Sequence, residues 1–234
     1  MTIRHLYQRQ IAPAYRLTLS PRSDQPATST NAGRCRIIGL VCVSDEWFEG
    51  DASTDTARRF VGALREYARS HHWYELGITP ADTALCPTDD LTQAAVNLVD
   101  RTTGRSYSIG TLRIEYAGQV LKGNWSDAQL VHEIELTDPE VLWLEDIPSA
   151  ELAAAHAGDW LDTQLRRPIV RRDWQFGGGK GRSLWVLADT DRHLVGVGTD
   201  LPFSDARGRW HQQNPPPTRP PDRVVIVRPD ARHN

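Results

Sequence analysis

The fold of this chain is decided by the segment Thr54-Asp-Thr-Ala-Arg-Arg-Phe-Val-Gly-Ala-Leu-Arg-Glu-Tyr-Ala-Arg-Ser-His-His72. Its apolar side chains recur at spacings of three, four and seven residues, which places them on one stripe of an α-helix. These side chains are Ala57, Phe60, Val61, Leu64, Tyr67, Ala68 and His71. Ser53 or Thr54 caps the start, and Gly77 is expected to end the helix in a left-handed conformation. The segment therefore predicts an amphipathic helix, with His71 packed in the core.

Strands are predicted on both sides of this helix in the sequence. Residues 14–20 alternate apolar and polar side chains, and residues 36–43 are almost continuously apolar, as in a strand covered on both faces. Residues 95–99 and 107–116 predict a hairpin around a turn at 100–105. The other strand candidates in this part are 129–136 and 141–144. Two turn-rich stretches, 21–34 and 79–90, are predicted as loops.

The last third of the chain predicts a second helix and a β-meander. The helix runs from Ile147 to about Leu165, with Pro148 in its first turn and Ser149 near the cap. The three strands of the meander are 168–174, 183–188 and 193–197, joined by a glycine-rich tip at 177–181 and a turn at 189–192. A polyproline connector at 214–222 then leads to one more strand at 224–227.

These elements predict an α+β fold. A mixed or antiparallel sheet with one long helix comes first, and a helix with a small antiparallel β-meander follows it. Charge divides the chain at a similar place, because residues 37–165 hold 22 acidic and 8 basic residues, whereas residues 166–234 hold 7 and 13. We therefore expect an acidic α+β domain at 1–146 and a basic subdomain at 147–234.

Several classes of protein find no support in the sequence. No run approaches the ~20 apolar residues of a membrane-spanning helix, and the start has no signal-peptide pattern. The three cysteines, Cys35, Cys42 and Cys86, lack metal-ligand spacing. A cytoplasmic protein with reduced thiols and no membrane partner is the resulting expectation. No motif identifies a family or a catalytic nucleophile, and the glycine-rich tip lacks the strand-to-helix context of a phosphate-binding loop.

An acidic cluster follows the predicted strand at 36–43. Its carboxylates are Asp45, Glu46, Glu49 and Asp51. Carboxylates at the end of a central strand supply the oxygen ligands that Mg²⁺ or Mn²⁺ prefers. The alternative is a solvated loop with helix-capping acids. Trp47 and Phe48 within the cluster are either core anchors or a stacking surface for a flat ligand.

A basic set in the last third is the best candidate for recognition of an anion. Its members are Arg166, Arg167, Arg171, Arg172, Lys180, Arg182, Arg192, Arg207 and Arg209. Basic side chains beside aromatic rings are typical of single-strand binders. However, Arg171 and Arg172 are neighbours on a strand and point to opposite faces. Trp174 and Trp185 are expected in the core of the small sheet.

Two function classes remain open. The first is a non-catalytic interaction protein whose basic part binds a nucleic acid or an acidic protein surface, or closes onto the acidic part of the same chain. The second is an enzyme, a metal-dependent hydrolase or phosphoryl-transfer protein centred on the acidic cluster. A structural subunit that forms a homo-oligomer is a third hypothesis, compatible with the eight tryptophans.

Overall fold

The computed structural model describes residues 45–87, 91–102, 106–126, 140–198 and 217–231. All of them belong to one compact unit. The predicted strands at 14–20, 36–43 and 129–136 and the predicted loop at 21–34 lie outside the described residues. The domain boundary expected at 146 stays a prediction, although one apolar core draws residues from both sides of it.

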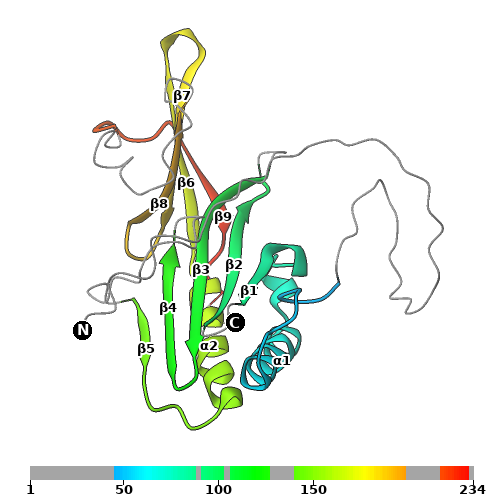
Figure 1. Cartoon of the computed structure of the whole chain (residues 1–234). Helices are drawn as coiled ribbons and strands as arrows, with labels where there is room; N and C mark the ends of the chain where they lie inside the picture. The colour runs from blue at the N-terminus through cyan, green and yellow to red at the C-terminus, as the bar shows by residue number, and fades with distance from the viewer. Residues whose placement is uncertain (1–44, 88–90, 103–105, 127–139, 199–216, 232–234) are drawn as a thin grey trace, which may run out of the picture. The chain divides into compact units, whose positions relative to one another are not determined.

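The first sheet is antiparallel and has the strand order β1-β2-β3-β4-β5 (Figure 1). Its strands are β1 (Thr83–Pro87), β2 (Thr92–Asp100), β3 (Tyr107–Ala117), β4 (Val120–Ser126) and β5 (Leu142–Leu144). The predicted hairpin is confirmed, since β2 and β3 pair from Thr92 with Tyr116 to Asp100 with Tyr107. Strands β1 and β4 were not predicted from the sequence. The prediction of a loop at 79–90 is wrong for Thr83–Pro87, which form β1.

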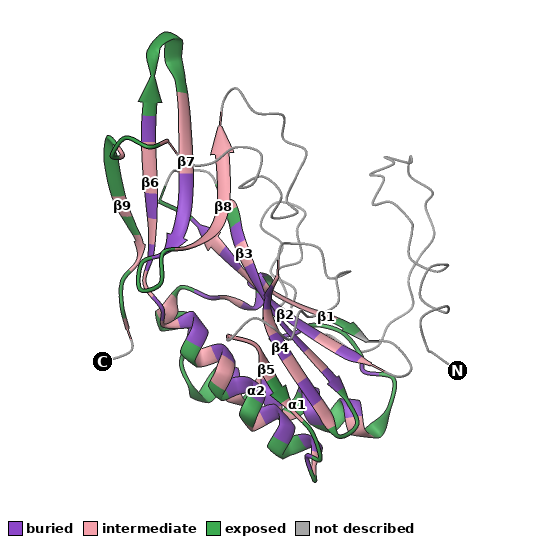
Figure 2. Cartoon of the chain, turned by 90° about the vertical axis from the view of Figure 1, so that its left-hand side faces the viewer, coloured by how far each residue is buried: buried purple, intermediate pink, exposed green. Residues whose placement is uncertain are grey.

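Two helices cover the same face of this sheet (Figure 2). They are α1 (Asp55–Ser70) and α2 (Ala150–Leu165), capped by the side chains of Thr54 and Ser149 respectively. The predicted stripe is confirmed for α1, because Phe60, Leu64 and Ala68 are each 0% exposed. Both helices and the sheet face beneath them form one core. Each helix packs its apolar stripe on this face of the sheet, because an amphipathic helix is stable only when that stripe is covered.

The end of α1 differs from the expectation. His71 is exposed and stacks on the ring of Tyr67 at 3.7 Å, so its assignment to the core is wrong. His72 takes the left-handed conformation after α1, with φ 54°. Gly77, with φ 73°, instead ends the short helix η2 (Trp73–Leu76). Likewise Pro148 precedes the cap of α2 and is not in its first turn.

The second sheet has the strand order β8-β7-β6-β9 and is also antiparallel. Its strands are β6 (Ile169–Phe176), β7 (Lys180–Leu187), β8 (Arg192–Gly198) and β9 (Arg223–Arg228). The predicted meander and the final strand are therefore confirmed, and the α+β fold with them. The tip between β6 and β7 is formed by η4 (Gly177–Gly179), where Gly178 and Gly179 both have φ 75°. Such a conformation favours glycine, so this glycine run is explained by the turn.

The ring of Tyr67 on α1 packs against Gly158 of α2. A Cβ atom at this position would lie 2.5 Å from ring carbons of Tyr67. The Tyr67 hydroxyl also donates a 2.7 Å hydrogen bond to Asp159 of α2, and burial together with this bond raises the pKa of Tyr67. The ring of Tyr67 is therefore held against α2 at Gly158, the residue of this helix that has no side chain.

We predict that Gly158→Ala lowers the free energy of unfolding by about 1–3 kcal/mol, because the added methyl group overpacks the helix contact. Gly62→Ala is the matched control. It lies in α1 with no atom within 4 Å of the added Cβ, so it should stabilise the protein by about 0.5–1 kcal/mol. Urea unfolding of both variants measures the difference. Equal effects would contradict the proposed close contact.

Candidate functional site

The acidic cluster forms a surface loop that is attached to the core by two buried aromatic residues. Trp47 and Phe48 are 1% and 0% exposed, so they are core anchors and not a stacking surface. The guanidinium of Arg65 donates to the backbone oxygens of Trp47, Phe48 and Gly50 at 2.8–2.9 Å and pairs with Glu46 at 2.9 Å. The loop is therefore held by an arginine of α1.

The carboxylates of this cluster are all on the exposed surface: Asp45, Glu46, Glu49 and Asp51. Among the described residues, no three His, Cys, Asp or Glu side chains gather as metal ligands would. The positions of these four carboxylates do not favour a metal site over a solvated loop. The hypothesis of a metal-dependent enzyme stays an untested prediction.

Arg171 of the basic set lies inside the protein. Its Nη1 donates to Asp100 at 2.8 Å and its Nε to Asp173 at 3.0 Å. Asp100, at the end of β2, is 0% exposed and also accepts from Trp185 Nε1 at 2.8 Å and from Thr102 at 2.7 Å. Burial alone would raise the pKa of Asp100, but these hydrogen bonds outweigh it and hold the pKa below its ordinary value.

Arg167 forms a second buried centre, between α2 and β6. It is 6% exposed, and its Nε and Nη2 each donate to Asp189 at 2.9 Å. Its Nη1 donates to Glu140 at 2.8 Å, and Arg192 of β8 holds the other oxygen of Glu140 at 2.7 Å. Basic residues of the last third are thus neutralised by acids from both parts of the chain.

Two further members of the basic set have local acidic partners. Arg166 pairs with Asp162 at 2.6 Å, and Arg172 with Asp191 at 2.6 Å. Arg207 and Arg209 lie outside the described residues. The basic surface expected from the sequence is therefore smaller, because five arginines of the basic set form ion pairs with acids of the same chain. These are Arg166, Arg167, Arg171, Arg172 and Arg192.

Lys180 and Arg182 lie at the tip of the β6–β7 hairpin, away from α2 (Figure 1). Lys180 is exposed and forms no ion pair in the described part of the chain. Phe176, opposite Lys180 in the register, is 37% exposed. The guanidiniums of Arg182 and Arg219 lie 5.8 and 5.2 Å from the centre of its ring. We call this group, Phe176, Lys180, Arg182 and Arg219, the hairpin-tip cluster.

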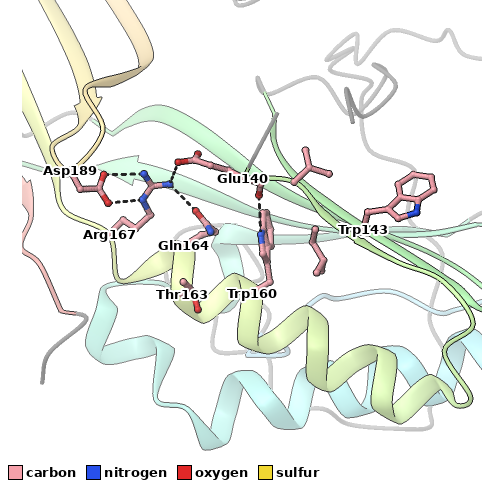
Figure 3. A pocket seen from close by; sticks show the side chains of 9 residues that line it. Glu140, Trp143, Trp160, Thr163, Gln164, Arg167 and Asp189 are labelled. Carbon is pink, nitrogen blue, oxygen red and sulfur yellow. Dashed lines mark hydrogen bonds and ion pairs between the residues drawn. The ribbon is translucent and has the colours of Figure 1, made fainter. Parts of the chain in front are cut away.

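A groove of about 520 Å³ opens between β5 and α2 (Figure 3). It is lined by Glu140, Val141, Leu142, Trp143, Trp160, Thr163, Gln164, Arg167 and Asp189. Trp143 is 37% exposed, and Lys122 lies 4.5 Å from the centre of its ring. Only Arg167 of these residues was singled out from the sequence. The signal that was missed is the helical spacing of Trp160, Thr163, Gln164 and Arg167.

Comparisons with known proteins give no relative, since no family model, no curated protein and no solved structure matches the chain. Neither helix of the described part is both long and apolar enough to cross a bilayer.

We predict that Asp100→Asn destabilises the protein by about 3 kcal/mol at pH 7, because Arg171 loses a buried charged partner. The lowered pKa of Asp100 means that this stabilisation is present above about pH 4 and is lost as the pH falls through the folded-state pKa. Chemical unfolding of wild type and variant should therefore show a gap that narrows below pH 4.

The control for this prediction is Glu66→Gln, which breaks an exposed ion pair with Arg69 on α1. It should change the free energy of unfolding by no more than about 0.5 kcal/mol at any pH. A gap between wild type and Asp100→Asn that stays constant from pH 7 to pH 3 would show that the charge of Asp100 is not responsible.

Proposed function

We propose that this chain is a non-catalytic interaction protein and that its hairpin-tip cluster binds an anionic partner. The observation that carries the proposal is the position of Lys180, an exposed cation without an ion pair in the described structure, at the end of a two-stranded projection. Five other bases of the candidate set form ion pairs with acids of the described chain, namely Arg166, Arg167, Arg171, Arg172 and Arg192.

The composition of the cluster favours nucleic acid over an acidic protein surface. The guanidiniums of Arg182 and Arg219 lie beside the partly exposed ring of Phe176, Lys180 pairs with Phe176 in the register, and Asp222 pairs with Arg219 at 2.6 Å. Arginine and lysine side chains contact phosphates, while an aromatic ring offers contact area to a base. The glycines of η4 leave the backbone uncovered at the turn, so a bulky polyanion can approach it closely.

We predict that a 20-nucleotide single strand binds the full chain, with an affinity that falls with salt. Each phosphate contact contributes about −0.7 to the slope of log affinity against log salt for a single strand. The double variant Lys180→Ala/Arg182→Ala should reduce the slope by about 1.4, since two contacts are lost. Fluorescence anisotropy between 25 and 200 mM salt, about the range in which such contacts are screened, measures it.

The matched control is Arg59→Ala/Arg69→Ala, which removes two exposed bases from α1. This variant should bind as the wild type does. Binding of polyglutamate in preference to the single strand would assign the cluster to an acidic protein surface. Absence of binding to every polyanion at low salt would refute the proposed function.

A further inference from the structure

The outer edge of β9 is an exposed apolar strand. β9 is the last strand in the order of the second sheet and pairs with β6 along one edge, and no described strand pairs with its other edge (Figure 2). Among the large apolar side chains of the described residues, Ile226 and Val224 are the most exposed, at 68% and 57%. They are two residues apart on a strand, so they lie on the same face of the sheet. An edge strand of this kind is a template for pairing with another strand.

The sequence of β9 restricts which strand can pair with it. It reads Arg223-Val-Val-Ile-Val-Arg228, with Asp222 directly before it. A complementary strand must be apolar at its centre, must not place a base opposite either arginine, and gains from an acid at one end. β9 of a second copy has an apolar centre and carries Asp222 at its start. It therefore meets these requirements in an antiparallel register that keeps the arginines of the two copies apart.

The regular part of the edge restricts that register. Val227 is the extra residue of a bulge, so Arg223–Ile226 pair regularly with β6. Successive residues of a regular strand direct their backbone N–H and C=O groups to opposite edges, so odd-numbered residues must pair with odd ones and even with even. A two-fold axis through Val225 satisfies this rule. Val224 of each copy then lies opposite Ile226 of the other, and Asp222 opposite Arg228, with no two arginines opposed.

We propose that the chain forms a two-fold symmetric dimer through β9, in which the second sheets of two copies join into one continuous sheet. The interface is isologous, because both copies use the same strand. Backbone hydrogen bonds along β9 and two contacts between Val224 and Ile226 stabilise it, and these contacts cover part of the apolar surface that the monomer exposes. The dimer does not depend on the function proposed for the hairpin-tip cluster.

Sedimentation of the full chain over a concentration series measures the dimer. Val224→Glu and Ile226→Lys each place a charge opposite an apolar residue at two symmetric positions, so each should raise the dissociation constant of the dimer about tenfold. The double variant Val224→Glu/Ile226→Lys should recover the dimer, since each glutamate then lies opposite a lysine. This recovery is specific to the register, because an axis through residue 224 or 226 would oppose like charges. Both positions are exposed, so the variants should fold as the wild type does, which circular dichroism checks.

The matched control is Leu152→Lys, which introduces the same charge at an exposed apolar residue of α2. This variant should dimerise as the wild type does, and so should Lys180→Ala/Arg182→Ala, which separates the dimer from the hairpin tip. Amide hydrogen exchange at Val224–Ile226 should slow as the protein concentration rises. A chain that stays monomeric at about 100 µM, a dimer that neither single substitution weakens, or a double variant that does not recover it would each overturn the proposal.

Discussion

The buried carboxylate of Asp100 is the contact on which the arrangement of the two sheets depends. It lies at the end of β2 in the first sheet, and it accepts hydrogen bonds from Arg171 of β6 and Trp185 of β7 in the second. A fully buried charge is tolerated only when it is paired and its remaining lone pairs are satisfied. The carboxylate belongs to the first sheet and both of these donors to the second, so the buried ion is satisfied only in one relative placement of the two sheets. The hydrogen-bond network therefore specifies the placement of the two sheets more narrowly than apolar packing alone would.

The same requirement explains the uneven distribution of charge along the chain. In the described part of the chain, several acids of the first part and bases of the last part meet inside the fold. Arg171 with Asp100 and Arg167 with Glu140 are pairs of this kind, at sequence separations of 71 and 27 residues. The hypothesis that the basic part closes onto the acidic part agrees with these contacts. Among the described members of the basic set, Lys180 at the hairpin tip is exposed and forms no ion pair within the described chain.

Periodicity predicted most of the regular structure, and its failures have local causes. The stripe of α1 and the β2–β3 hairpin follow from side-chain spacing alone. β4 was missed because Gly123 and Asn124 interrupt it, yet Gly123 is required where a Cβ would lie 2.8 Å from Ile114. β1 was missed because it ends at Pro87, a residue tolerated at an edge strand. Such positions are decided by neighbours that are distant in sequence.

Candidate sites were harder to predict than elements, because a site depends on which side chains the fold leaves unpaired. Sequence alone treats Arg167 and Lys180 alike, whereas the structure buries the first among acids and leaves the second exposed. β6 separates the two, and its eight residues span roughly 26 Å at about 3.3 Å each. The groove beside Arg167 and the hairpin-tip cluster therefore lie near opposite ends of one rigid strand.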